Sequence, residues 1–367
     1  MGHPVRYTPS VETVEADEDE TVRALEEQFR IILDTTSQDY GHAVRSVHAK
    51  GHGIARGMLT IAENLPPELA QGLFSTSGRH EAILRLSTNA GDILDDSIRL
   101  PRGIALKILG VEGERLPGSE GDGTQDFLMV NGPAFAAPDP KKFLGNLKLL
   151  AKTTDKAEGA KKALSAVLRA FEATLEAVGG QSATLVSLGG AKPVHPLGAT
   201  YFSQTPFRYG NYIAKFQLVP VSGIKDYADV TIDAGGRPDA IREDVNDVLS
   251  AQGGTWDLRV QLCMNLETMP IEDPTVVWDE AQSPFRTVAT LQVAPQTGWI
   301  PGESEATEDA LSFSPWHGLA AHQPLGAVNR ARKDSYVMSA HYRARFNGCP
   351  IHEPRALSEL ANGGAPS

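Results

Sequence analysis

Two kinds of hydrophobic pattern alternate along the chain and predict a protein that combines helices with many short strands. Residues 20–36 carry apolar side chains at helical spacing with charged residues between them, which predicts an amphipathic helix. From residue 43 onward, short segments rich in valine, isoleucine, leucine and phenylalanine alternate with glycine, proline and aspartate turns, which predicts strands. The strands predicted in this first region are 43–50, 54–62, 82–88, 102–110 and 126–131.

A helical region separates these strands from a second strand-rich region. Residues 140–152 and 156–178 have helical composition, and the second segment ends at a Gly-Gly pair that favours helix termination. We expect residues 298–315 to form a loop. The second region contains predicted strands at 211–221, 227–233, 256–264 and 285–293, and a predicted helix at 238–251.

Many strands on both sides of one helical region indicate a single α+β domain rather than separate domains. The architecture that fits is a large antiparallel β-barrel with helical insertions packed around it. We assign this domain to residues 20–361. Residues 1–19 are polar and end in an acidic run, so we expect a flexible arm, and we expect residues 362–367 to be a flexible tail.

Composition excludes several classes of function. The 367 residues are 41% hydrophobic and 22% charged, as in an ordinary globular protein. A net charge of −12 disfavours nucleic acid or an anionic membrane as a partner, because either would require a basic face. The two cysteines, Cys263 and Cys349, lack the spacing of a zinc or disulfide framework. No apolar run reaches the roughly 18 residues of a membrane span and no secretory signal precedes the domain, so we expect a cytoplasmic protein.

His48 is the first residue whose surroundings suggest chemistry. It lies between apolar neighbours in the predicted strand 43–50, where a single histidine is usually an ordinary packed side chain. Arg45 precedes it by three positions, so in a strand the two side chains point to opposite faces unless a bulge intervenes. Strand geometry alone therefore does not predict that they share a site.

Four separate segments together resemble the catalase family. The first, Arg-Ser-Val-His-Ala-Lys-Gly, matches the family's Arg-x-x-His-Ala-[Arg/Lys]-Gly motif, and the next two resemble barrel strands that follow it. The similarity extends over residues 41–135 and 285–330. It implies a catalase-type barrel, haem b (iron protoporphyrin IX) as cofactor and peroxide as substrate. The four segments are residues 45–51, 84–88, 99–107 and 314–317.

The resemblance also implies roles for individual residues. His48 would be the distal acid–base residue above the haem iron, and Ser87 would support it through a hydrogen bond. Arg45 and Arg85 would bind the haem propionates, because a planar guanidinium can donate two parallel hydrogen bonds to a carboxylate. The other residues assigned to the cofactor are Val47, His322 and Arg330.

The chain departs from the family beside the distal histidine. Catalases carry an asparagine there, in an Asn-Thr-Pro motif that helps to orient hydrogen peroxide. We align residues 123–130 with this motif, and no asparagine is found among them. Thr124 and Gln125 stand nearest and become candidate catalytic residues, with a polar turn as the alternative.

A second departure concerns the ligand below the iron. Catalases use a tyrosinate in an Arg-x-x-x-Tyr motif, followed by His-Arg-Leu-Gly. Anchoring the alignment on Leu325-Gly326 puts His317 at the tyrosine position, so His317 is the predicted iron ligand, and imidazole is a known haem ligand. A structural Trp-His pair is one alternative, and Tyr336 or Tyr342 as ligand is another.

These assignments predict a haem-dependent peroxidase with weak catalase activity. It would act on hydrogen peroxide or organic hydroperoxides with an organic reductant, and His48 would carry the proton. Two alternatives remain: a fatty-acid hydroperoxide isomerase or oxygenase of the allene-oxide-synthase type, and a non-catalytic catalase-fold haem-binding or scaffold protein. Self-association into a homo-oligomer through the acidic arm and the first helix also stays open, because amphipathicity alone does not decide it.

Overall fold

The structure is a computed structural model that describes residues 2–154 and 194–362. The predicted helix at 156–178 lies outside the described residues. The helices are α1 (Glu18–Tyr40), α2 (Pro140–Thr154), α5 (Ala240–Gln252), α6 (Glu303–Ala310) and α7 (Ala327–Asn347). The strands are β1 (Gly51–Ile61), β2 (Gly78–Thr88), β3 (Arg102–Leu109), β4 (Thr124–Val130), β5 (Tyr201–Phe202), β6 (Phe207–Tyr209), β7 (Tyr212–Pro220), β8 (Gly254–Leu262) and β9 (Arg286–Val293).

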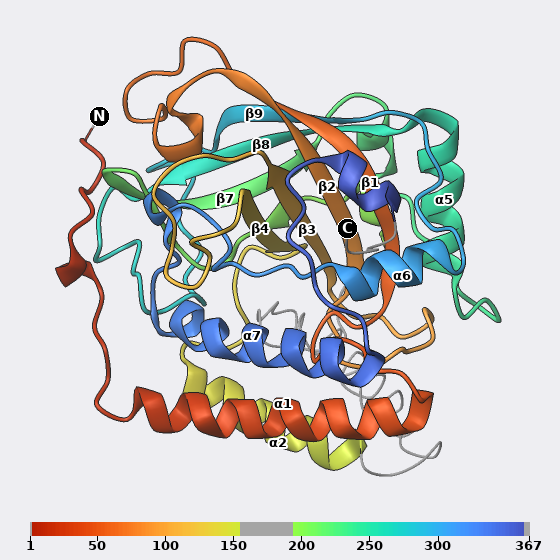
Figure 1. Ribbon diagram of the computed structural model, residues 1–367. Helices are drawn as coiled ribbons and strands as arrows, with labels where there is room; N and C mark the ends of the chain where they lie inside the picture. The colour runs from red at the N-terminus through yellow and green to blue at the C-terminus, as the bar shows by residue number, and fades with distance from the viewer. Residues whose placement is uncertain (1, 155–193, 363–367) are drawn as a thin grey trace, which may run out of the picture.

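The described strands form one antiparallel sheet that closes into a barrel (Figure 1). Their order is β5-β4-β3-β2-β1-β9-β8-β7-β6, and an additional pairing of β5 with β7 closes the circle. This confirms the predicted α+β class and the antiparallel barrel. A closed barrel leaves few free strand edges, which explains why so many short strands are stable together.

The interior of the barrel is the main hydrophobic core. Alternate residues of each strand point inward, for example Leu84 and Leu86 of β2 and Leu106 of β3, and all three are buried. The outward residues between them include charged and polar side chains. Every residue of β3 is buried, so its outward face is also covered by other parts of the chain. A barrel face that is both polar and covered is where a site can form.

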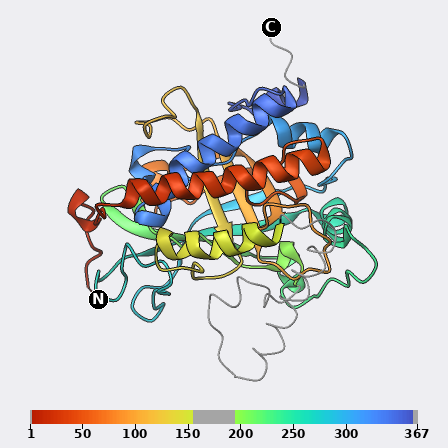
Figure 2. The same ribbon diagram turned by 90° about the horizontal axis from the view of Figure 1, so that it is seen from below.

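Helices cover this outer face in a second layer. Helix α7 runs beneath β2, β3 and β4, and α1 and α2 lie beyond it (Figures 1 and 2). A small hydrophobic cluster joins the three helices through Leu25, Leu147 and Ala331. Val47 and Met338 pack against the same cluster. The segment that contains the catalase-like motif is therefore held between the barrel and the helical layer.

Three predicted elements differ from the structure. Residues 43–50 are irregular and the strand begins at Gly51, because the chain turns at His48. Residues 227–233 form no strand among the described residues; an isolated bridge joins Thr231 to Val194, and most of the stretch is exposed. The predicted loop 298–315 contains α6, whose first turn is closed by a hydrogen bond from Gly302 N to Glu305 Oε2 (2.6 Å).

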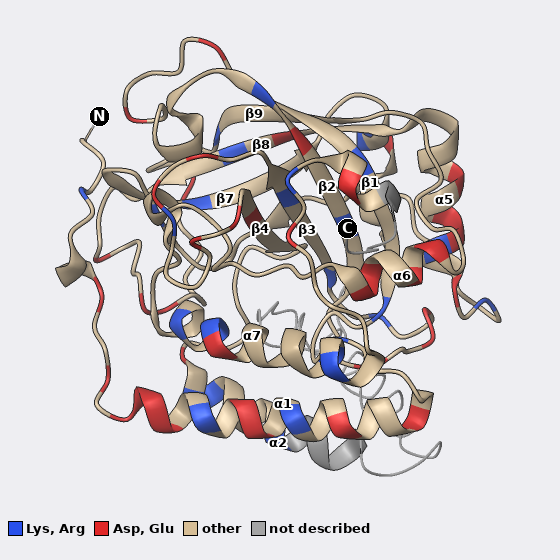
Figure 3. Cartoon of the chain, viewed as in Figure 1, with Lys and Arg blue, Asp and Glu red and all other residues tan. Residues whose placement is uncertain are grey.

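The acidic arm is not free in the part of the chain that the structure describes. Val5 N donates to Cys263 O (2.8 Å) and Tyr7 N donates to Asn211 O (2.9 Å), so the arm lies along the barrel. Acidic side chains also mark α1, α5 and α6 (Figure 3), in keeping with the net charge of −12. No helix within the described ranges is long and apolar enough to cross a bilayer.

Candidate functional site

His48 lies in a turn rather than in a strand. Its φ of 53° is in the left-handed region, which costs a residue other than glycine on the order of 1–3 kcal/mol. The turn is held because His48 N donates to Asn89 O (3.1 Å) and Ala49 N donates to Ala90 O (2.8 Å). Strand alternation does not apply here, which explains how Arg45 and His48 reach the same site.

The imidazole of His48 lies directly on β2 and β3. Its Nδ1 is 3.1 Å from Ser87 Oγ, and Ser87 pairs with Gly103 across the two strands. A Cβ atom at Gly103 would lie 2.4 Å from both Cε1 and Nδ1 of His48, so only glycine leaves room for the ring. The Ser87 hydroxyl donates weakly to Gly103 O (3.5 Å), which leaves its oxygen to accept from Nδ1–H. Nε2 is then the nitrogen with a free lone pair.

His48 is neutral at ordinary pH. Burial, together with the positive charges of Arg85, Arg332 and Arg45, lowers the pKa of its imidazole to about 3. A neutral imidazole can accept a proton, which an imidazolium cannot. The environment therefore keeps His48 in the form that a general base requires.

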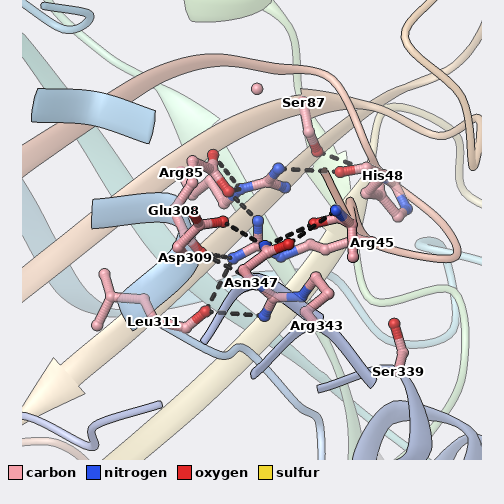
Figure 4. A network of polar contacts seen from close by, with 12 residues as sticks. Arg45, His48, Arg85, Ser87, Glu308, Asp309, Leu311, Ser339, Arg343 and Asn347 are labelled. Atoms are coloured by element: carbon pink, nitrogen blue, oxygen red, sulfur yellow. Dashed lines mark hydrogen bonds and ion pairs between the residues drawn. The ribbon is translucent and has the colours of Figure 1, made fainter. Parts of the chain in front are cut away.

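Three arginines, two of them buried and the third with a side chain that is 14% exposed, converge next to His48 (Figure 4). We call Arg45, Arg85 and Arg343 the arginine cluster. Arg85 Nε donates to both carboxylate oxygens of Glu308 (2.7 and 2.9 Å), Arg45 also pairs with this carboxylate, and Arg85 Nη2 donates to His48 O (2.9 Å). The guanidinium groups of Arg45 and Arg343 both donate to the main-chain oxygens of Glu308 and Leu311, at 3.0–3.1 Å.

The arginine cluster is a site of high positive potential. Burial lowers the pKa of Arg85 to about 9 and that of Arg343 to about 10, and it holds the pKa of Arg45 well below its usual range. Repulsion from Arg343 adds to the effect on Arg45 and Arg85. Because buried guanidinium groups stabilise anions strongly, the cluster suits a ligand with carboxylates. Arg343 was not among the residues predicted from the sequence.

Helix α7 brings a tyrosine to the same region. Arg332 Nη2 donates to Tyr336 Oη (3.2 Å), with the guanidinium 5.3 Å from the centre of the tyrosine ring. Arg332 contributes to the lowered pKa of His48, and Tyr336 raises the pKa of Arg85, so both residues are close to the site. The pair has the Arg-x-x-x-Tyr spacing of the catalase motif, which puts both side chains on one face of the helix.

The structure does not bring His317 to His48. Its Nδ1 is 3.4 Å from Asp126 Oδ2 and 3.3 Å from Glu353 Oε1, beside Lys107, whose Nζ is 2.8 Å from Asp126 Oδ1. Lys107 is four residues along β3 from Gly103, on which His48 lies, and four strand residues span about 13 Å. The His317 imidazole lies beside a separate group of charged side chains, and we withdraw it as the iron ligand.

His322 and Arg330 also lie away from the arginine cluster. The His322 ring is fully buried inside the barrel next to Phe74, and its Nε2 accepts a hydrogen bond from Leu73 N (3.0 Å). Arg330 forms ion pairs that hold the N-terminal arm and α1 in place, so its guanidinium is not available to a cofactor. Its partners are Glu12, Glu18 and Glu272.

Thr124 and Gln125 lie at the wrong end of β4 to act with His48. Thr124 pairs with Leu109, at the opposite end of β3 from Gly103, and its hydroxyl donates to Glu353 (3.0 Å). Gln125 accepts a hydrogen bond from Leu319 N (2.9 Å). Both side chains are buried in structural contacts.

An asparagine stands at the end of the strand pair on which His48 lies, one residue beyond the aligned segment 123–130. Asn131 follows β4 directly, and its neighbour Val130 pairs with Gly103. Arg102 N donates to Asn131 Oδ1 (2.8 Å), and Asn131 N donates to Arg102 O (3.0 Å). The sequence Asn131-Gly132-Pro133 keeps the first and third residues of Asn-Thr-Pro, which was the available signal.

Comparison with solved structures shows the same fold in three catalases. A fungal catalase has a TM-score of 0.61 at 21% identity, over 87% of this chain and 63% of that one. Catalase A from Saccharomyces cerevisiae has a TM-score of 0.59 at 19% identity, over 97% and 70%. A bacterial catalase has a TM-score of 0.58 at 19% identity, over 96% and 66%. This chain thus spans 63% to 70% of the length of these catalases.

Sequence comparison identifies the family. No curated protein matches the chain. The family model described as Catalase matches residues 38–298, which is well over half of the sequence and includes β1 to β9. The match agrees with the barrel and with the motif around His48. The chain belongs to the catalase family.

Proposed function

We propose that this chain is a haem-dependent enzyme that consumes hydrogen peroxide at the site around His48. One observation carries the proposal: three separate parts of the chain bring a neutral imidazole, an Arg332–Tyr336 pair and the arginine cluster to one region. Each element alone has a structural explanation. Together they supply a base, a candidate iron ligand and partners for two carboxylates.

The residues present fit a haem with two propionates. Arg45, Arg85 and Arg343 would bind the propionates, and Tyr336 would be the ligand to the iron. The Nε of Arg343 is buried and has no hydrogen-bond partner in the described structure, which is unusual for a buried donor. A propionate oxygen would satisfy it. We propose haem b, because its two free carboxylates match this cluster.

Haem, when bound, supplies an iron that exchanges electrons with a peroxide. The residues of this chain would handle the proton. His48 Nε2 would accept a proton from the bound peroxide and deliver it to the departing oxygen, while Ser87 holds Nδ1. Asn131 Oδ1 is occupied by Arg102 N, so its amide nitrogen is the group that would donate to the peroxide.

Asn131 changes the expected balance of activities. The expectation of weak catalase activity rested on the absence of an asparagine beside His48. Asn131 at the end of β4 would supply this amide, and Tyr336 would take the place of the histidine ligand. The two departures that favoured a reductant-dependent peroxidase or a hydroperoxide isomerase then no longer apply. We therefore propose dismutation of hydrogen peroxide as the main activity and oxidation of an organic reductant as the side activity.

The proposal is tested with purified protein, haemin and two assays. We expect haemin to bind with a Soret band and the loaded protein to release oxygen from hydrogen peroxide. The substitution His48→Ala should keep the Soret band and slow oxygen release by about 10²–10⁴-fold, the usual contribution of a positioned acid–base group. Protein that binds no haemin, or a His48→Ala variant with the parent rate, would refute the proposal.

A further inference from the structure

Glu308 places a carboxylate inside the arginine cluster before any ligand arrives. Arg85 donates to both of its oxygens, and Arg45 pairs with one of them. The Glu308 side chain is 11% exposed and that of Arg85 is 3% exposed. The Glu308 carboxylate therefore contacts the same guanidinium groups that would bind a carboxylate of the cofactor.

Several features of the chain hold Glu308 there. Two members of the arginine cluster, Arg45 and Arg343, bind the main-chain oxygens of Glu308 and Leu311 at the end of α6. Gly51 leaves room for the Glu308 carboxylate, because a Cβ atom at Gly51 would lie 2.5 Å from Glu308 Oε1. The position of this carboxylate is thus built into the barrel and into α6.

The charges in this region do not cancel. Three guanidinium groups carry three positive charges, and Glu308 supplies one negative charge in direct contact with them. Asp309 raises the pKa of Arg45 and Arg343 from a greater distance, but its Oδ1 is within hydrogen-bonding distance of His42 (3.1 Å) and Asn347 (3.2 Å). The contacts leave a surplus of two positive charges, the number that two propionates would neutralise.

On the basis of the proposed haem function, we propose that Glu308 is a resident counter-ion of the propionate site. It stabilises the empty site, because buried cations without a partner are strongly unfavourable. It also weakens the binding of a dicarboxylate porphyrin, because like charges held close together repel each other. Glu308 thereby sets the affinity for the cofactor, and it does so without contacting the peroxide.

The substitution Glu308→Gln tests this role, because it removes the charge and keeps the shape and one acceptor oxygen. The haem-free variant should melt roughly 5–10 °C below the parent protein, the effect of breaking a buried ion pair in a chain of this size. Its affinity for haemin should rise by about 10–100-fold, which corresponds to the removal of a repulsion of about 1.4–2.8 kcal/mol. Haemin dimethyl ester, which lacks the two charges, should bind both proteins equally.

A matched control is Glu303→Gln, in the exposed first turn of the same helix, which should leave both affinities unchanged. If haemin binds neither the parent protein nor Glu308→Gln, the proposed function fails. If haemin binds the parent protein, and the variant binds it equally or more weakly, the role of Glu308 is overturned while the proposed function stands.

A second measurement applies if haem-free Glu308→Gln does not fold. The haem-loaded parent and variant are mixed with excess apomyoglobin, which captures released haem, and the rate of haem loss is followed by absorbance. We expect the variant to lose haem at least about tenfold more slowly than the parent, as its tighter binding requires. Equal or faster loss would overturn the role.

Discussion

Replacing Gly103 by alanine should disable the site without removing the cofactor. The added Cβ atom would lie 2.4 Å from Cε1 and Nδ1 of His48 and 3.0 Å from Ser87 Oγ. Carbon atoms in contact are normally about 3.5–4.0 Å apart, so the imidazole must shift by at least about 1 Å. The backbone cannot yield easily, because β3 pairs with both β2 and β4 at this point.

A displacement of this size should be visible in the rate. A 1 Å misplacement of a reacting group can cost about 10²-fold, so we expect oxygen release by Gly103→Ala to be slower by about that factor. Haemin should still bind, because the arginine cluster and Tyr336 are untouched. The assay combines oxygen release with a Soret titration of the same sample.

Gly78→Ala is the matched control. Gly78 begins β2, and a Cβ atom there would have no neighbour within 4 Å. This variant should have the parent rate. If Gly103→Ala also retains the parent rate while binding haemin normally, the contact between His48 and the barrel is not what positions the imidazole, and the reasoning fails.

Two further predictions concern stability. Burial lowers the pKa of His322, like that of His48, to about 3, so below pH 6.5 the unfolded chain binds protons that the folded chain does not, and stability falls with falling pH. Each histidine should lower the free energy of unfolding by about 2 kcal/mol between pH 7 and pH 5. Urea unfolding of His322→Gln should therefore show a decrease over this interval that is smaller by about 2 kcal/mol than in the parent. The same decrease in both proteins would contradict the assignment. Lys107→Met should destabilise the protein by about 3–5 kcal/mol, because it leaves the fully buried Asp126 without its cation. Burial alone would raise the pKa of Asp126, but its contacts with Lys107 and His317 lower the pKa overall. A Lys107→Met variant with the melting temperature of the parent would show that the pair is not stabilising.

The fold and half of the site could be predicted because their signals are local. Alternating apolar residues mark β2 and β3, and Arg45 and His48 belong to one short motif. The turn that brings these two residues to one site could not be predicted, because a left-handed backbone conformation at His48 does not change the hydrophobic pattern of the sequence.

The other half of the site depends on register and on long-range contacts. Asn131 was missed because the end of a strand is uncertain by several residues, and the alignment stopped just before it. Tyr336 was given less weight than His317 because the alignment was anchored on Leu325-Gly326 without a gap, which placed the motif before α7 rather than in it. Glu308 looks like an ordinary solvent-facing acid, since its arginine partners come from distant segments.

The identity of the iron ligand tests the central claim most directly. We propose to record Soret spectra of the haemin-loaded parent protein, Tyr336→Phe and His317→Ala under the same conditions. We expect Tyr336→Phe to lose haemin or to have a shifted spectrum, and His317→Ala to have the same spectrum as the parent. A changed spectrum for His317→Ala together with an unchanged one for Tyr336→Phe would contradict the site described around α7.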